Sequence, residues 1–272
     1  MRSKRKIKKT SFVLLIILLL SIWSWVPVTE RITLDLTGSG PAGLRIALIT
    51  DLHSCYYGSG QKSLINRIDR EEPDIIIFAG DIFDDNLSDD NAKILCEALV
   101  EKYPCYYVTG NHEYWSGRAD SIKDYLRTIG VHVLEGECEQ IEEGGVMFDI
   151  CGVDDPTYID YYDWNDMLDR AYSETDPSHI RILVSHRPEK IKTYIKYDYD
   201  LILTGHAHAG QFRIPFINRG VYVPDQGYMA TYVSGKYELS NGSIMIVSRG
   251  LARESTPLPR YFNHPEVVII DI

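Results

Sequence analysis

Short apolar runs that alternate with amphipathic stretches constrain the fold of this chain more than any other feature. The runs read as buried strands at LRIALIT (44–50), DIIIFA (74–79) and CYYVT (105–109). Apolar residues at helical spacing predict helices at 61–72, 92–102 and 121–130. Strands that alternate with helices in this way predict an α/β layered domain.

The second half of the chain is richer in strands than in helices. Short strands are predicted at 131–136, 145–153, 181–185 and 201–204, and one helix is predicted near 163–172. Glycine turns divide the stretches 221–239 and 242–250, which is typical of antiparallel meander strands. We therefore expect a mixed sheet, or two sheets packed face to face with helices outside, rather than a purely parallel sheet.

Side chains able to bind a metal ion follow five of the predicted strands at once. In chain order they are Asp51 and His53, Asp81 with Asp84, Asn111 with His112 and Glu113, His186, and His206 with His208. Strand ends at one edge of a sheet converge on a crevice, where ligands bind in α/β proteins. Five of the eight histidines occupy these positions, and the other three are interpreted as structural, namely His132, His179 and His264.

The mixture of donor atoms indicates which ions would suit such a crevice. Carboxylate, amide oxygen and imidazole together favour manganese, iron, zinc or nickel, unlike the all-oxygen ligands of calcium. Residues at positions i and i+2 of an extended segment point to the same side. Asp51 with His53, and His206 with His208, can therefore face one space, and the two imidazoles of GHAH (205–208) could each bind one of two neighbouring ions.

The order D-x-H, G-D-x-x-D, G-N-H-E, a lone strand-end histidine and G-H-x-H over residues 44–210 resembles the calcineurin-like metallophosphoesterases. The later stretches GQFRIPF, VYVPDQGYM and SRGL resemble a subgroup of membrane-anchored bacterial phosphodiesterases, some of which act on lipid-linked pyrophosphates. The resemblance implies a four-layer αββα sandwich of two mixed sheets, with a single catalytic domain over 44–272. It also implies two divalent metal ions, whose identity among manganese, iron, zinc and nickel stays open.

The same resemblance implies a role for each motif residue. One metal would bind Asp51, His53 and His208, the other would bind Asn111, His186 and His206, and Asp81 would bridge both. His112 would act as general acid or electrostatic stabiliser, and Asp84 would orient His112 or a ligand. A hydroxide bridging the two metals would then attack a phosphodiester or pyrophosphate. The alternative is a calcineurin-like scaffold without activity that binds a protein partner.

The amino terminus predicts a membrane anchor. Residues 1–10 are a basic tail, and residues 11–28 carry no charge and are long enough to cross a bilayer as a helix. The bases place the tail in the cytoplasm, and the catalytic domain on the extracytoplasmic side of the cell membrane. A cleaved signal peptide is the alternative, although no small-x-small cleavage site follows the run. Residues 29–43 are interpreted as a linker that could include a first edge strand.

Charge and cysteine content exclude some functions. The first nine residues hold six bases, and the remaining 22 bases and 39 acids make the body a poor general binder of nucleic acid. None of the five cysteines forms a C-x-x-C pair, so a thiolate zinc site is not indicated. An exported location permits disulfides, but scattered and mostly buried thiols are the preferred interpretation. The protein is expected to be a monomer.

Three arginines, Arg187, Arg213 and Arg219, are candidates for phosphate contacts or for plain surface charge. Nearby tyrosines could line an apolar wall or serve packing, at Tyr222, Tyr228 and Tyr232.

Overall fold

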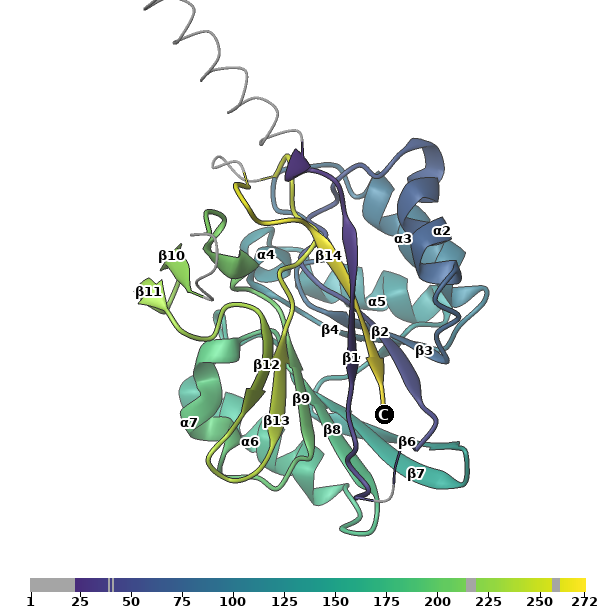
Figure 1. Cartoon of the computed structure of the whole chain (residues 1–272), viewed down its shortest axis with the longest axis vertical. Coiled ribbons are helices and arrows are strands. Elements are labelled where there is room, and N and C mark those ends of the chain that lie inside the picture. The colour runs from purple at the N-terminus through teal and green to yellow at the C-terminus, as the bar shows by residue number, and fades with distance from the viewer. Residues whose placement is uncertain (1–22, 39, 41, 214–218, 256–259) are drawn as a thin grey trace, which may run out of the picture.

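Two six-stranded mixed sheets form the centre of the protein, in a computed structural model that describes residues 23–272 except 39, 41, 214–218 and 256–259 (Figure 1). The first sheet has the spatial order β1 (Val28–Thr33), β14 (Glu266–Asp271), β2 (Arg45–Ile49), β3 (Ile75–Ala79), β4 (Cys105–Val108), β5 (His132–Val133). The second has the order β12 (Gly235–Glu238), β13 (Ile244–Val247), β9 (Leu201–Thr204), β8 (Ile180–Val184), β7 (Val146–Gly152), β6 (Glu137–Glu143). The predicted α/β fold with two mixed sheets is confirmed.

Most strands of each sheet run parallel, which places their carboxyl ends at one edge. Strands β2, β3, β4 and β5 are mutually parallel, and β14 is antiparallel to β2 but parallel to β1. Strands β13, β9, β8 and β7 are also parallel, with β12 and β6 antiparallel at the two edges. The segments that follow β2, β3, β4, β8 and β9 can therefore meet.

Alternation along each strand explains the layers. In β3, Ile75 and Ile77 face the space between the two sheets, whereas Ile76 and Phe78 face the helices outside. The strand is buried on both faces, so it reads as a continuous apolar run. Strand β9 divides in the same way, because Leu201 lies between the sheets while Ile202 packs on the opposite, helical side.

Helices cover the outer face of each sheet. The first sheet is covered by α2 (Lys62–Asp69), α3 (Asp90–Val100) and α5 (Ala119–Ile129), and the second by α6 (Tyr161–Ser173) and α7 (Ile191–Tyr194). Three apolar clusters thus separate a helix layer, two sheets and a second helix layer. The short helix α4 (Asn111–Trp115) and the 3-10 turns η1 (Ser59–Gln61), η2 (Pro188–Lys190) and η3 (His208–Gly210) lie in connecting segments.

Several strands differ from the sequence-based expectation. The predicted strand 131–136 contains only the two residues of β5, and β6 follows it, unpredicted because ECEQIEE carries so little apolar character. The predicted meander is split, since β10 (Gly220–Val223) and β11 (Gly227–Ala230) form a separate hairpin beside the sheets. The edge strand suggested within 29–43 exists as β1, and it pairs with the unpredicted β14.

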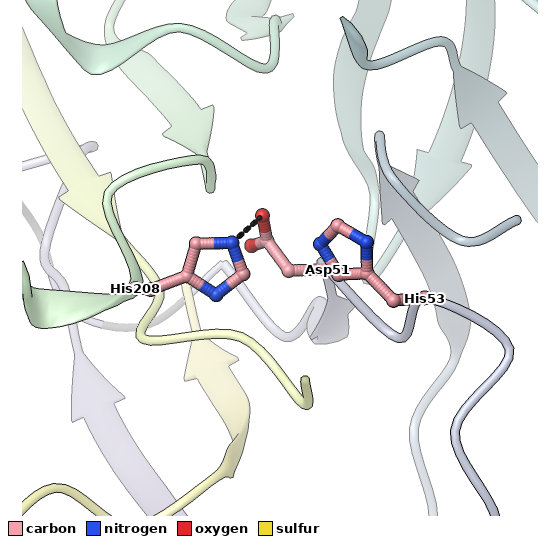
Figure 2. Close-up of side chains that lie close together, drawn as sticks. All are labelled: Asp51, His53 and His208. Carbon is pink, nitrogen blue, oxygen red and sulfur yellow. Dashed lines mark ion pairs between the residues drawn. The ribbon is translucent and has the colours of Figure 1, made fainter. Parts of the chain in front are cut away.

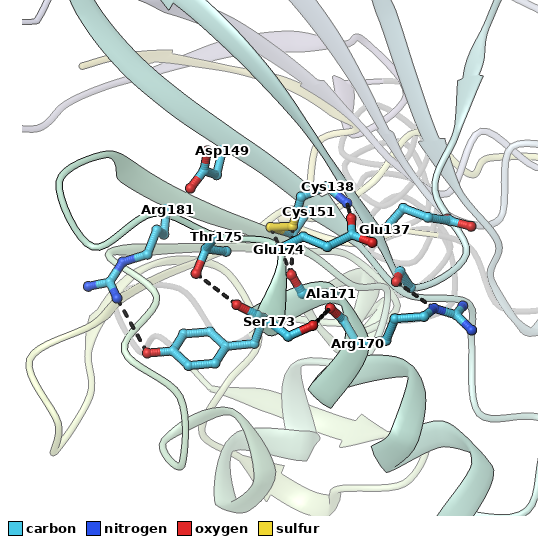
Figure 3. The surroundings of a disulfide bond; sticks show 12 residues. Glu137, Cys138, Asp149, Cys151, Arg170, Ala171, Ser173, Glu174, Thr175 and Arg181 are labelled. Atoms are coloured by element: carbon cyan, nitrogen blue, oxygen red, sulfur yellow. Dashed lines mark hydrogen bonds between the residues drawn. A yellow bond between two sulfur atoms is a disulfide. The ribbon is translucent and has the colours of Figure 1, made fainter.

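Two of the cysteines form a disulfide, contrary to the preferred interpretation of free thiols. Cys138 of β6 and Cys151 of β7 are directly opposite each other in the antiparallel ladder, with Cα atoms 4.0 Å apart (Figure 3). The register therefore brings together two residues that spacing alone could not pair. The other three cysteines are free and buried, at Cys55, Cys96 and Cys105.

The predicted basic tail and most of the predicted anchor lie outside the described residues, which begin at Trp23. From that residue on, and leaving aside the short gaps named above, no helix has both the length and the apolar character to cross a membrane.

Candidate metal centre

The structure brings together all seven predicted ligand residues at the carboxyl ends of five strands. Asp51 and His53 follow β2, Asp81 follows β3, Asn111 begins α4 after β4, His186 follows β8, and His206 and His208 follow β9. Six of them are almost completely buried, and the His208 side chain is 12% exposed. Two sheets thus supply one cluster, since the loops of the first sheet meet those of the second.

Asp81 lies at the centre of the cluster. Its Oδ2 atom is 3.1 Å from His186 Nε2 and 3.7 Å from His53 Nε2. One ligand atom from each of Asp81, His186 and His206 falls within 4.8 Å of the others, which is the spacing of a metal site. A carboxylate with imidazoles on both sides can contact ions on both sides.

Asp51 gathers the other half of the cluster. Figure 2 shows His208 pointing toward the Asp51 carboxylate, with Nε2 and Oδ1 3.5 Å apart, while His53 approaches from the loop that also carries Asp51. One ligand atom from each of these three residues also falls within 4.8 Å of the others. His186 Nε2 lies 3.9 Å from the same Asp51 oxygen, so the two halves adjoin.

Buried polar atoms that lack a hydrogen-bond partner indicate whether these residues are suited to hold metal ions. Within the described part of the chain, four such atoms belong to the cluster: His53 Nε2, Asp81 Oδ2, Asn111 Oδ1 and His186 Nε2. An unpaired buried polar atom is costly, so a fold that gathers four of them in one place indicates a ligand that satisfies them. Imidazole nitrogen, carboxylate and amide oxygen form the donor set of first-row transition metals.

Hydrogen bonds on the second ring nitrogen orient two of the imidazoles. His53 Nδ1 lies 3.1 Å from Asp84 Oδ2, and His186 Nδ1 lies 2.8 Å from the carbonyl oxygen of Ala79. Each ring therefore keeps Nε2 directed at Asp81. Such outer partners fix the tautomer and the ring orientation of metal-binding histidines. Of the two roles suggested for Asp84, the contact with His53 is the closer one.

His206 is oriented by residues that sequence reasoning assigned differently or missed. Its Nε2 atom lies 3.2 Å from Asp225 Oδ2, and Arg187 Nη1 donates a hydrogen bond to the same carboxylate. Arg187 is also held by Asp155, with its Nε 2.6 Å from an Asp155 oxygen. Arg187 was a candidate phosphate contact, whereas here its guanidinium is paired with two carboxylates next to His206. Asp225 stands in the stretch VYVPDQGYM, which was noted only for its resemblance to a subgroup, and Asp155 stands in no motif.

His112 lies in the first turn of α4 and borders the cluster from the more open side. Its side chain is 22% exposed, and its ring centroid is 4.2 Å from that of His53. His112 Nδ1 lies 2.7 Å from Asp85 Oδ1 but 3.7 Å from Asp84, so Asp85 orients this ring. The exposed indole of Trp115 stands beside it, with ring centroids 4.7 Å apart.

Glu113 joins two of the ligand-bearing loops. This fully buried carboxyl accepts hydrogen bonds from the backbone N–H groups of Asp81, Phe83 and Gly110. Burial, together with the Asp81 charge, raises the pKa of Glu113 to about 7. The final position of the G-N-H-E motif therefore fixes the loop after β3 against the start of α4.

The electrostatics of the cluster favour positive charge. Burial lowers the pKa of the His186 imidazole, but the carboxylates of Asp81 and Asp51 outweigh burial and raise that pKa to about 10. Burial raises the pKa of the Asp81 carboxyl in turn, and His186 outweighs it and holds that pKa well below its usual range. The region between these side chains is thus suited to cations.

The loops that carry the predicted ligands adopt a backbone conformation that only a supporting structure maintains. Positive φ angles between 45° and 62° occur at Asp51, His53, Asp81, His206 and His208. Each such residue costs about 1–3 kcal/mol, and strain of this kind gathers at functional sites. Gly250 belongs to the same arrangement, because a Cβ atom there would lie 2.5 Å from the Asp51 Cβ. Gly250 is the glycine of the stretch SRGL, which was noted for its resemblance to a subgroup without a role in the site.

The chain is similar to several known proteins. Residues 44–210 match the model of a family described as calcineurin-like phosphoesterase. A metallophosphoesterase of Aquifex aeolicus, named as uncharacterized, is 33% identical over 254 residues that cover 89% of this chain and 90% of that protein. A Helicobacter pylori metallophosphoesterase is 31% identical over 79% of this chain and 56% of its own length. A Bos taurus transmembrane protein with metallophosphoesterase domain is 29% identical over 79% of this chain, which spans 50% of that protein.

Solved structures resemble the chain in fold. Haemophilus influenzae NAD nucleotidase superposes with a TM-score of 0.52 at 17% identity, over 77% of this chain and 46% of that one. A dimetal phosphatase from Danio rerio superposes with a TM-score of 0.50 at 13% identity, over 78% and 88% of the two chains. At these identities the likeness concerns the arrangement of sheets and helices alone.

Proposed function

The chain belongs to the calcineurin-like phosphoesterase family and is a phosphoester hydrolase, and we propose that it cleaves a phosphodiester or a pyrophosphate at a centre of two divalent metal ions. The observation that carries the proposal is the convergence of four buried, unpartnered ligand atoms from both sheets in the described part of the chain. The complete set of motif residues favours an enzyme over a scaffold that binds a protein partner.

Each metal is assigned a set of residues by motif. Asp51, His53 and His208 would hold one ion, Asn111, His186 and His206 would hold the other, and Asp81 would contact both. The short distances around Asp51 and around Asp81 support this division. Manganese is the first candidate, and iron, zinc and nickel suit the same donors.

The chemistry follows from where the residues lie. Bound divalent ions lower the pKa of water and neutralise charge on phosphate oxygens. His112 is placed to donate a proton, or a hydrogen bond, to the departing oxygen, because it borders the cluster on its exposed side. Asp85 keeps the His112 ring in place through Nδ1, which leaves Nε2 for the substrate.

A membrane location is part of the proposal. The uncharged run at 11–28 would anchor the protein with the catalytic domain on the extracytoplasmic side, and a lipid-linked phosphoester is then the favoured substrate. The transmembrane protein with metallophosphoesterase domain among its relatives supports an association with membranes. The anchored protein is proposed to act as a monomer, without nucleic acid as a partner.

The test uses the full chain purified in detergent, because β1 begins at Val28 and a truncation after it would remove part of the first sheet. Bis-p-nitrophenyl phosphate is supplied with Mn²⁺, and we expect turnover that a chelator abolishes. The variant His112→Ala should keep its metal and lose about 10²–10⁴-fold in rate. The variant Asp81→Ala should lose the metal itself.

His132→Ala is the matched control. His132 lies on β5, where it contacts Glu139 and none of the predicted ligands. It should leave both rate and metal content unchanged. A His112→Ala protein that loses its metal would contradict the division of roles. A wild-type protein that binds metal but hydrolyses no monoester, diester or lipid pyrophosphate would overturn the proposed function.

A further inference from the structure

Large aromatic side chains lie exposed on segments that adjoin the metal centre. We name them the aromatic rim, which consists of Trp23, Trp25, Tyr56, Phe212, Tyr222 and Tyr228. Each is at least 41% exposed, and Tyr228 reaches 80%. In Figure 1, β1 begins at the top of the molecule, and the β10–β11 hairpin projects from its upper left side, near the height of α4. Soluble proteins seldom expose many large aromatic residues at one end, so this surface needs an explanation.

Contacts with one carboxyl-terminal segment join the first part of the rim. The ring of Trp23 stands edge-on to His264 with centroids 4.1 Å apart, and the Arg253 guanidinium lies 5.5 Å from the centre of the Trp25 ring. Arg253 also donates hydrogen bonds to the carbonyl oxygens of Trp25 and Tyr56. These three aromatic residues are therefore held by one stretch of the chain near the carboxyl end.

The second part of the rim is joined to the first through Phe212. Its ring lies 5.6 Å from that of Tyr261, and its carbonyl accepts a hydrogen bond from Val221 at the start of the β10–β11 hairpin. Tyr222 and Tyr228 face each other across that hairpin, with ring centroids 5.2 Å apart. The two parts of the rim are therefore linked through the segment 260–264, since Phe262 also donates a hydrogen bond to Ser24 beside Trp23.

The rim is also attached to the metal centre. Asn263 donates a hydrogen bond of 2.7 Å to the carbonyl of His208, and Arg260 Nη2 lies 3.5 Å from His208 Nδ1. The backbone N–H of Leu251 donates to the carbonyl of Asp51. The segments that carry the rim therefore support two of the predicted ligands.

The segments that carry the rim contain few acidic residues. Residues 205–230 and 249–264, which carry the hairpin and the supporting segments, contain five arginines, no lysine and only two acids. The chain as a whole has 28 bases and 39 acids. Most of these arginines are held within the fold, because Arg260 is 1% exposed and the side chains of Arg249 and Arg253 are 12% and 15% exposed and lie beside Glu266 and Glu254. The segments therefore present aromatic rings rather than a row of charges.

We propose that the aromatic rim rests on the surface of a lipid bilayer, so that the metal centre receives a phosphoester carried by that bilayer. Tryptophan and tyrosine concentrate at membrane interfaces because each combines an apolar ring with a polar group. The uncharged sequence 11–22 leads directly into Trp23, so the rim begins where that apolar run ends. The substrate part of this inference rests on the proposed function, whereas the contact with lipid does not.

The experiment places a fluorescent dye on the rim of the full chain. Tyr228→Cys and Tyr56→Cys are two rim positions on different segments, and Glu142→Cys is the control, exposed near the β6–β7 turn at the opposite end of the sheets (Figure 1). The native free cysteines are buried, so the dye reports the engineered site. Each protein is reconstituted into vesicles of phosphatidylcholine and phosphatidylglycerol that carry a nitroxide on the acyl chain.

Side chains that enter an interface lie about 5–10 Å deep, so quenching at positions 228 and 56 should be at least about twice that at 142. Equal quenching at all three positions would overturn the inference. So would a dye signal at 228 that follows protein concentration instead of lipid, because a second copy of the chain would then cover the rim.

Hydrolysis measured on the same vesicles separates the two proposals. Quenching at the rim without turnover of any phosphoester would leave the bilayer contact in place and overturn the proposed function. Turnover of bis-p-nitrophenyl phosphate without selective quenching at the rim would do the reverse. Two rim positions keep the test valid if one variant fails to fold.

Discussion

Removing the metal ions should destabilise the whole protein by a measurable amount. Four buried ligand atoms have no hydrogen-bond partner within the described chain. Each unsatisfied buried atom costs about 1–3 kcal/mol, so four cost about 4–12 kcal/mol. The lower end applies, because His186 Nε2 and Asp81 Oδ2 lie 3.1 Å apart and partly satisfy each other when the metal is absent.

A ligand whose free concentration is a thousand times its Kd stabilises the folded protein by about 4 kcal/mol, which is the same amount. For a protein of this size, each kcal/mol shifts Tm by about 2–4 °C, so a chelator should lower Tm by about 8–16 °C. Thermal unfolding of the full chain in detergent, followed by near-ultraviolet circular dichroism, measures the shift. Added Mn²⁺ should restore Tm.

Asp81→Asn is the control for this effect, because it weakens the central ligand while it keeps nearly the same shape. Its Tm should respond little to chelator or to metal. The reasoning is refuted if the wild-type protein, shown to contain metal, keeps the same Tm after the chelator has removed it. The convergence of unpartnered atoms would then have another cause.

Three further predictions concern other contacts of the site and the cysteines. Asp225→Asn should lower metal affinity by about 10–100-fold, because the orienting partner of His206 is weakened, and titration with metal measures the change. Gly250→Ala should abolish metal binding because its Cβ would press on Asp51, whereas Gly242→Ala, at a similarly positive φ but with open space around it, should bind metal normally. The native protein should show no thiol that reacts with Ellman's reagent at pH 8. The denatured protein should show three reactive thiols, and the denatured and reduced protein should show five. Reaction of a native thiol would contradict the burial that raises the pKa of Cys105 to about 12.

Strands and motifs with local signals were predictable from the sequence. The run DIIIFA is apolar on both faces, so it had to be a central strand, and Asp81 had to follow its end. The same reasoning located His186 and His206 after β8 and β9. Each of these residues needed only the period of its own strand and the rule that strand ends converge.

Contacts between distant segments could not be predicted in this way. The pairing of Asp225 with His206 and Arg187 depends on how the β10–β11 hairpin folds back, for which no periodic signal exists. The disulfide between Cys138 and Cys151 depends on the register of β6, a strand whose polar sequence concealed it. Five cysteines allow many pairings, and only the register selects one.

The position of β14 has a consequence for how the protein is made. This strand lies between β1 and β2, so residues 266–271 pair with both strands at the opposite end of the chain. During synthesis, β1 and β2 can both emerge from the ribosome long before their shared neighbour exists. Such non-local pairing slows folding and leaves strand edges open to other chains. Strand β2, which leads into Asp51, therefore acquires its second neighbour only when translation has passed residue 271. Until then, one edge of β2 has no strand paired to it.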